Sequence, residues 1–212
     1  MTQRSGQGVL FDLDGTLIDS NYQHVRIWRD VLAEHGREVP YWKVHRAIGL
    51  PSERLLLFLL GELPDAAQSM IDTHDRRFVE QASTLRPTAG AVALLAELER
   101  RELPFCAVTS AGAETREVLF KALGRSLPHA GDSKKHPPKP SPSPLLAAAD
   151  HLGLAPAGLL MIGDAIWDGE AARRAGVHFI GLRCGGTADE LLRQSGALWV
   201  EDAPRELMGR LA

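Results

Sequence analysis

The chain has 212 residues, of which 44% are apolar and 24% are charged, a composition typical of an ordinary soluble globular protein. Its net charge of −3 gives no general attraction to nucleic acid or to an anionic membrane, so we expect neither as a partner. The longest apolar run, Leu55 to Leu60, is too short to cross a bilayer, and the polar residues 1–8 do not resemble a signal peptide. Two cysteines make no disulfide framework, and we expect a cytoplasmic protein.

The first predicted element is a short buried strand over residues 9–11, which leads directly into Asp12, Leu13, Asp14 and Gly15. Because side chains alternate along a strand, Asp12 and Asp14 should point the same way. Two carboxylates on one side of a strand end repel each other unless a cation or a shared proton holds them there. This segment therefore predicts a functional site, and a metal site in particular.

A helical region follows this strand. Apolar residues at helical spacing, together with glycine and proline at the ends, predict helices over residues 22–35, 42–48, 51–60 and 65–82. The stretch Leu55 to Leu60 is apolar all round, so we expect the third helix to be buried on several sides. No strand pattern interrupts residues 20–85, which predicts a helical unit inserted after the first strand.

From residue 85 onward, strands alternate with helices. The predicted strands are 105–109, 158–162, 177–182 and 198–200, and the predicted helices are 89–101, 114–123, 144–152, 166–175, 188–195 and 204–211. This alternation is typical of a parallel sheet with helices on both faces. In such sheets ligands bind outside the carboxyl ends of the strands, so functional residues should lie there.

Two further strand ends carry groups that complement Asp12 and Asp14. Thr109 and Ser110 close the strand 105–109, and their hydroxyls can hold a phosphate oxygen or can simply cap the next helix. Asp164 closes another strand, and Asp168 follows one helical turn later. These two carboxylates either extend an oxygen-rich pocket of the kind Mg²⁺ prefers or act as a helix cap and a favourable first-turn charge.

Lys139 lies in a proline-rich loop, between Pro138 and Pro140. Prolines on both sides stiffen the loop, and a fixed lysine can neutralise a phosphate and the crowded carboxylates. Two other interpretations remain open for residues 134–144: a solvated basic linker, or a polyproline ligand for a partner protein.

The order of these motifs resembles that of the phosphatases of the haloacid dehalogenase superfamily, in the branch with a helical cap after the first strand. The motifs are, in chain order, Asp12-Leu13-Asp14-Gly15-Thr16, Thr109, Lys139-Pro140-Ser141-Pro142 and Gly163-Asp164 with Asp168. The resemblance covers essentially the whole chain and is greatest to the phosphoglycolate phosphatase-like proteins. It implies an α/β fold, with a doubly wound, Rossmann-like parallel-sheet core over residues 1–19 and 86–212 and an α-helical cap over residues 20–85.

The resemblance also implies roles for individual residues. Asp12 would be the nucleophile that forms an aspartyl-phosphate, and Asp14 would protonate the leaving alcohol and then activate water. Thr109, with its neighbour Ser110, and Lys139 would bind the transferring phosphoryl group.

A Mg²⁺ cofactor is part of the same implication. The Asp12 carboxylate, the Asp14 backbone carbonyl and Asp164 would hold the ion, and Asp168 would orient the site from behind. Residue 165 departs from the family pattern, because alanine stands where Ser, Thr or Asp is usual, and we expect modestly weaker support for the metal.

The predicted function is Mg²⁺-dependent hydrolysis of a small phosphorylated metabolite. Phosphoglycolate is the leading substrate, and a sugar phosphate or a nucleotide fits nearly as well. Glu53 and Arg54, in a loop of the cap, are candidates for substrate specificity. His24 lies on the first cap helix and could approach the site, but we interpret it as a surface histidine. Two alternatives stay open: a phosphomutase of the β-phosphoglucomutase type, and a non-catalytic scaffold. Nothing in the sequence predicts the oligomeric state.

Overall fold

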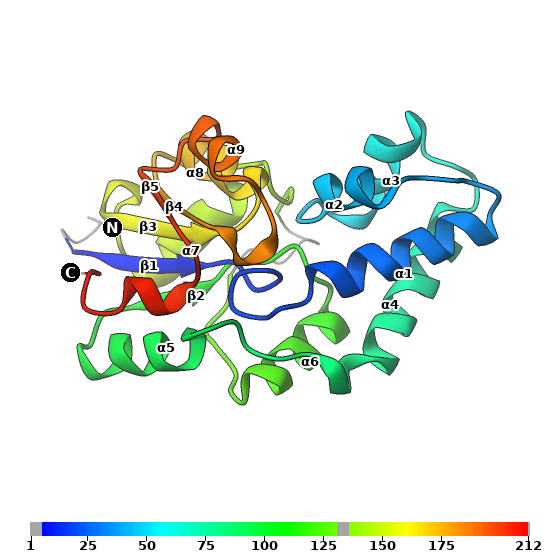
Figure 1. Ribbon diagram of the computed structural model, residues 1–212. Coiled ribbons are helices and arrows are strands. Elements are labelled where there is room, and N and C mark those ends of the chain that lie inside the picture. Colours follow the sequence, from blue (N-terminus) through cyan, green and yellow to red (C-terminus); the bar gives the residue numbers. More distant parts are fainter. Residues whose placement is uncertain (1–5, 131–135, 212) are drawn as a thin grey trace.

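Five parallel strands form a single sheet in the computed structural model, which describes residues 6–130 and 136–211 (Figure 1). The strands are β1 (Gly8–Phe11), β2 (Phe105–Ala107), β3 (Leu159–Gly163), β4 (His178–Leu182) and β5 (Trp199–Glu201), in the order β2-β1-β3-β4-β5. Phe11 at the end of β1 lies opposite both Ala107 and Ile162. The three strands therefore end side by side, at the point where the strand order reverses and where such sheets bind ligands.

Helices cover both faces of the sheet, because the strand side chains alternate between two apolar layers. Val9 and Phe11 belong to one layer, and Leu10 between them belongs to the other. The first layer is covered by α5 (Ala91–Arg100) and α6 (Ala113–Leu123), and the second by α7 (Ser143–Leu152), α8 (Ile166–Ala175) and α9 (Asp189–Gln194). The predicted doubly wound α/β fold is confirmed.

Four helices between β1 and α5 pack together beyond the carboxyl ends of the strands (Figure 1). They are α1 (Asn21–Glu34), α2 (Tyr41–Ala47), α3 (Ser52–Leu60) and α4 (Ala67–Glu80), and we call them the helical unit. Its centre is the contact of α1 with α4, where Trp28 and Phe78 are 2% and 0% exposed. None of the helices within residues 6–130 and 136–211 combines the length and hydropathy that a bilayer crossing requires.

Two segments of the chain connect the helical unit to the sheet, and they lie side by side. Residues 17–19 and 86–88 are antiparallel, with a bridge between Ile18 and Pro87. Backbone hydrogen bonds of 2.9 and 3.0 Å join the two segments on either side of this bridge. The segment that enters the helical unit and the segment that leaves it are therefore hydrogen-bonded to each other.

Two local expectations were wrong. Residues 204–211 do not form an α-helix but one 3₁₀ turn, η4 (Pro204–Leu207), because Gly209 adopts a left-handed φ of 73° and too few residues remain to repay helix nucleation. Helix α3 is not buried on several sides, since Leu57 and Phe58 are 49% and 43% exposed. Three more 3₁₀ turns occur at η1 (Ala82–Thr84), η2 (Pro156–Gly158) and η3 (Arg183–Gly185).

Candidate active site

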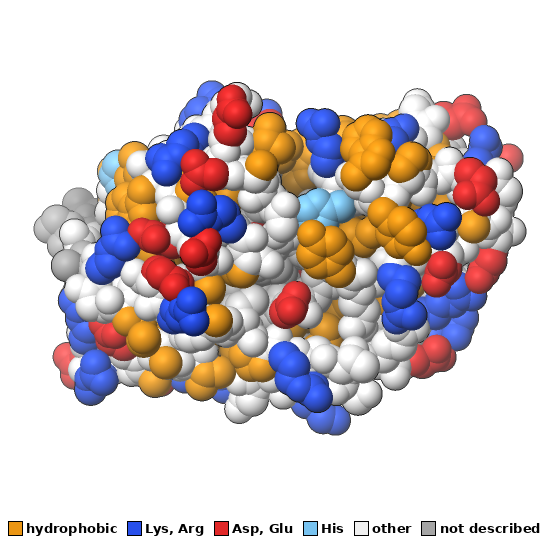
Figure 2. Space-filling model, in the orientation of Figure 1, with side chains coloured by type: hydrophobic (Ala, Val, Ile, Leu, Met, Phe, Trp, Pro, Cys, Tyr) orange, Lys and Arg blue, Asp and Glu red, His pale blue; other side chains and the backbone are white. Residues whose placement is uncertain are grey.

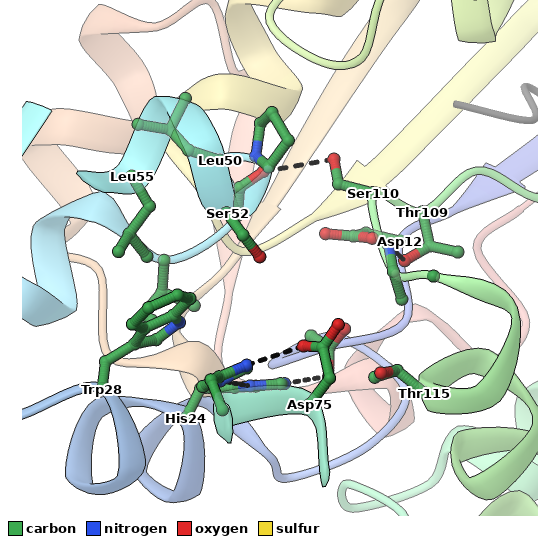
Figure 3. Close-up of a pocket in the computed structure, with 17 residues that line it drawn as sticks. Asp12, His24, Trp28, Leu50, Ser52, Leu55, Asp75, Thr109, Ser110 and Thr115 are labelled. Carbon is green, nitrogen blue, oxygen red and sulfur yellow. Dashed lines mark hydrogen bonds and ion pairs between the residues drawn. The ribbon is translucent and has the colours of Figure 1, made fainter. Parts of the chain in front are cut away.

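A cleft opens between the strand ends and the helical unit (Figure 3). On the sheet side it is lined by the loops that follow β1 and β2, including Asp12, Asp14, Thr109 and Ser110. The opposite side comes from α1, from α4 and from the chain around the start of α3. The structure thus brings four of the residues selected from the sequence into one cleft.

Lys139 lies behind the cleft and joins three acceptors. Its ammonium is 2.9 Å from Asp12 Oδ1 and 2.7 Å from Asp168 Oδ1, and it donates to the Val108 carbonyl at 3.1 Å. The side chain is only 1% exposed, which excludes a solvated linker at this position. Although burial alone would lower it, Asp12 and Asp168 raise the pKa of Lys139 above its ordinary value, so the ammonium stays charged. Lys134 and Lys135 of the same predicted loop lie outside the described residues.

Three buried carboxylates lie close together here, and two of them contact this ammonium. Carboxylate oxygens of Asp12, Asp164 and Asp168 all lie within 4.8 Å of one another. Burial raises the pKa of Asp12 well above its ordinary value; Lys139 opposes this shift, while Asp168 and Asp164 add to it. An excess of buried negative charge is costly, and a divalent cation among oxygen ligands would remove that cost. The donor set therefore fits Mg²⁺.

Asp164 is positioned by residues from three separate parts of the chain. Its two oxygens accept hydrogen bonds from Thr16 Oγ1 at 2.8 Å and from Asn21 Nδ2 at 2.7 Å. Burial, with Asp168 nearby, raises the pKa of Asp164 to about 7. Gly185 packs so closely that a Cβ atom there would lie 1.8 Å from Asp164 Oδ2. The room for this carboxylate thus depends on a glycine far away in the sequence.

Asp168 lies in the first turn of α8 and supports the others. Besides Lys139, it accepts a hydrogen bond from the Ala165 backbone N–H at 3.1 Å, which closes the start of the helix. Its helix-terminus role and its contact with Lys139 therefore coexist in one side chain.

Asp14 does not join this group through its carboxylate, which turns instead toward α1. The Asp14 carboxylate is held by two groups at the start of the helical unit. Ser20 Oγ donates to Asp14 Oδ1 at 2.6 Å, and His24 Nε2 lies 3.0 Å from the same oxygen. Burial opposes ionisation, but His24 and Ser20 lower the pKa of Asp14 below its ordinary value. The interpretation of His24 as a surface histidine was wrong, since the residue is buried.

A chain of hydrogen bonds continues from His24 across the helical unit. His24 Nδ1 lies 3.0 Å from His74 Nε2, and His74 Nδ1 lies 2.8 Å from Asp75 Oδ1. Burial lowers the pKa of His74 to about 4, so this ring is neutral at pH 7, with one donor and one acceptor. With Nδ1–H donating to Asp75, Nε2 accepts from His24. The contact between His24 and Asp14 must then contain one proton, which lies on the imidazole or on the carboxyl.

Thr109 and Ser110 face the cleft from the loop before α6. Thr109 Oγ1 accepts from the Ala111 backbone N–H at 3.0 Å within this loop, so it does not cap α6, whose N-cap is Gly112. Ser110 Oγ donates to the Gly49 carbonyl at 3.4 Å. Glu53 and Arg54 are exposed, and the structure does not bring them to the cleft. Their neighbours in α3, Ser52 and Leu55, line it instead.

The sequence analysis missed His74 and Asp75 and gave His24 a surface position. A signal for the histidines exists, because His24 lies four residues before Trp28, and His74 lies midway between Met70 and Phe78. This i, i+4 spacing places each histidine on the buried stripe of its helix. Thr16 belongs to the motif that begins at Asp12, but no comparable signal marks Asn21 or Gly185.

Comparison with known proteins agrees with this geometry. The model of the haloacid dehalogenase-like hydrolase family matches residues 7–176, a range that contains every carboxylate of the site from Asp12 to Asp168. The N-acetylmuramic acid 6-phosphate phosphatase of Pseudomonas aeruginosa is 30% identical over an alignment of 217 residues, gaps included. The alignment covers 95% of this chain and 93% of that protein. The phosphoglycolate phosphatase of Thiobacillus denitrificans is 33% identical over 182 residues, or 80% of each chain.

A solved structure is also close to this one. The crystal structure of a hydrolase from Pseudomonas syringae superimposes with a TM-score of 0.93 at 34% identity and covers 97% of both chains. The strand order, the paired aspartates after β1 and the lysine beside them are thus set in a fold shared over nearly the full length. This chain belongs to the haloacid dehalogenase-like hydrolase family.

Proposed function

We propose that this hydrolase is a Mg²⁺-dependent phosphatase, which releases phosphate from a small-molecule phosphate monoester through an aspartyl-phosphate on Asp12. The observation that carries the proposal is the buried cluster of Asp12, Lys139, Asp164 and Asp168 beside a cleft that also contains Asp14. Phosphatase names among relatives at 30% and 33% identity support it.

In the first step the Asp12 carboxylate attacks the phosphorus atom. A bond forms between the Asp12 oxygen and phosphorus, and the bond between phosphorus and the ester oxygen breaks. A proton reaches the leaving alkoxide through Asp14: the lowered pKa keeps this carboxyl ionised, so it passes on the proton of its hydrogen bond with His24. The product alcohol then leaves on the side of the helical unit.

In the second step water attacks the aspartyl-phosphate. Asp14, now without its proton, accepts a proton from this water, and the bond between phosphorus and the Asp12 oxygen breaks. Inorganic phosphate leaves and the Asp12 carboxylate is restored. Two moderate barriers thereby replace a single high one.

Charge is the main obstacle to this chemistry. A carboxylate and a phosphate oxygen repel by roughly 4 kcal/mol per charge pair at 4 Å in a semi-polar site. The Lys139 ammonium offsets part of this repulsion, and Asp168 orients Lys139. When bound, Mg²⁺ supplies further positive charge to the phosphoryl oxygens, and Asp12, Asp164 and the Asp14 backbone carbonyl would hold it. We assign the Thr109 and Ser110 hydroxyls to the remaining phosphoryl oxygens.

The test is phosphate release from a panel of small phosphate esters, with and without Mg²⁺. Asp12→Asn should lower metal-dependent release by more than about 10³-fold, because an amide is no nucleophile here. Asp19→Asn is the matched control: it removes an exposed carboxylate from the same loop and should leave the rate within twofold, roughly the spread of surface substitutions. No release from any ester would contradict the proposal and would direct the next assay to isomerisation of glucose phosphates, the mutase reaction.

A further inference from the structure

The wall of the cleft that faces the phosphate site is formed by the helical unit and combines apolar and polar groups (Figure 3). Trp28 and Leu55 supply apolar surface, while Ser52 and Asp75 supply oxygen atoms. In the proposed reaction the leaving alcohol departs on this side. The chemistry of this wall therefore limits which alcohol the site accepts.

Asp75 is the charged group of this wall. It lies on α4, and its side chain is 41% exposed, so it reaches the cleft rather than the interior. One carboxylate oxygen accepts from His74 Nδ1 at 2.8 Å, which fixes the direction of the group. An oriented carboxylate at the edge of a binding site accepts hydrogen bonds from substrate hydroxyls and repels a substrate anion.

No lysine or arginine balances Asp75 within the part of the cleft that the structure describes. The described residues that line it include neither lysine nor arginine. Arg76, the next residue on α4, pairs with Glu80 at 3.0 Å on the exposed side of the helix. Figure 2 shows the basic side chains of the face drawn there spread over its outer surface.

The two histidines do not replace a lysine as a group that binds a substrate carboxylate. His74 has Asp75 on one nitrogen and His24 on the other, and His24 has His74 and Asp14. Each ring nitrogen thus already has a partner, and none points a spare N–H at a substrate carboxylate. A substrate with a carboxylate would face Asp75 without a compensating partner on this wall.

We infer that the leaving group is a neutral polyhydroxy alcohol, that is, a sugar or polyol, and that esters of hydroxy acids are rejected. Hydroxyls of such an alcohol donate to Asp75 and exchange hydrogen bonds with Ser52, while its C–H groups pack against the apolar lining that includes Leu55 and Trp28. This inference rests on the proposed phosphatase function and narrows its substrate class. It also disfavours phosphoglycolate and N-acetylmuramic acid 6-phosphate, because the leaving group of each carries a carboxylate.

The experiment compares matched esters that differ only in CH₂OH against carboxylate at one carbon. The pairs are glycerol 3-phosphate with 3-phosphoglycerate, and glucitol 6-phosphate with 6-phosphogluconate; p-nitrophenyl phosphate reports general phosphatase activity. We expect kcat/KM of the wild-type enzyme to favour the neutral member by about tenfold or more in at least one pair, without reversal in the other.

Asp75→Asn then tests which group causes the preference. The amide oxygen can still accept from His74, but the negative charge is gone, so the ratio should fall severalfold through a gain on the acidic esters. Asp72→Asn is the matched control, because Asp72 lies on the same helix, is exposed and does not line the cleft. This control should leave the ratio unchanged.

The outcomes separate the two levels of the proposal. Equal or higher kcat/KM for the acidic members in the wild-type enzyme overturns the substrate class, while release from p-nitrophenyl phosphate keeps the phosphatase. An equal change of the ratio in Asp72→Asn and Asp75→Asn overturns the role of Asp75. No Mg²⁺-dependent release from any ester overturns both, and the wild-type ratio decides the substrate class even if Asp75→Asn does not fold.

Discussion

The two sides of the cleft are built on different physical principles. The sheet side gathers buried carboxylates around one ammonium at the ends of adjacent parallel strands, and its stability depends on charge balance. The helical side gathers two histidines and one carboxylate among aromatic rings, and every ring nitrogen of these histidines is in a hydrogen bond. The sheet side is thus suited to phosphoryl transfer, and the helical side to choosing the alcohol. This difference predicts that substitutions on the two sides impair the activity and the stability of the enzyme in different ways.

The largest effect is expected at the centre of the charged side. Lys139→Met leaves Asp12 and Asp168 buried without their ammonium, and we expect about 3–5 kcal/mol lower unfolding free energy and a loss of more than about 10³-fold in kcat. Urea unfolding and phosphate release measure the two effects. Lys121→Met, on the exposed side of α6, is the control and should change neither. A variant of Lys139 that keeps a tenth of the activity would contradict the role of this charge.

The helical side should respond to pH instead. The pKa of His74 is about 4 in the folded protein against an ordinary 6.5, so between these values the unfolded chain binds a proton that the folded chain does not. The contribution of His74 to the unfolding free energy is therefore fully present above pH 6.5. As the pH falls to 4, the unfolding free energy decreases by about 3 kcal/mol through this residue.

His74→Gln removes this titration, so the difference in unfolding free energy between wild type and variant should shrink by that amount on going from pH 7 to pH 4. Urea unfolding at intermediate pH values follows the change, and groups common to both proteins cancel. His151→Gln, on the exposed side of α7, should track the wild type at every pH. A constant difference between wild type and His74→Gln would show that His74 does not titrate as its burial implies.

A smaller effect is expected at Gly185, where the charged side meets a distant loop. An added Cβ would overlap Asp164 Oδ2, so Gly185→Ala must displace this carboxylate. We expect the Mg²⁺ concentration for half-maximal activity to rise by about 10–100-fold, the usual range for lost support of a ligand. Phosphate release over a Mg²⁺ titration measures it, and an unchanged half-saturation point would remove Asp164 from the metal site.

The smallest effect is expected on the outer face of α3. Arg54→Ala should change kcat/KM by less than about twofold for any ester, because the residue is exposed and lies away from the cleft. Leu55→Ala, one residue later, lines the cleft and should raise KM several times more than Arg54→Ala does. The reverse order of these two effects would restore the specificity role that the sequence suggested for Arg54.

The sequence predicted the sheet side well because its residues follow strands directly. Asp12, Thr109 and Asp164 each come at or just after the end of a buried apolar run, and parallel strands bring those ends together whatever their separation in sequence. Alternation of strands and helices likewise predicted every strand and most helices within two residues. Only the last helix failed, where a proline and a glycine leave room for a single turn.

The helical side could not be predicted in the same way. The hydrogen bond between His24 and His74 depends on how α1 and α4 cross, and helical periodicity indicates which residues are buried but not which ones meet. Asp75 adjoins a buried residue and looks like any surface acid in the sequence. The rotation of α3 about its own axis depends on the same packing, and it decides that Leu55 and not Arg54 lines the cleft.

The paired segments 17–19 and 86–88 have a mechanical consequence. Because Ile18 and Pro87 bridge the two connections, the helical unit is tethered to the sheet by a two-stranded ribbon instead of two independent linkers. The two hydrogen bonds beside this bridge couple the segments, so displacing one of them relative to the sheet requires displacing the other or breaking these bonds. This coupling holds the helical unit, and with it Asp75 and Trp28, in one position over the strand ends.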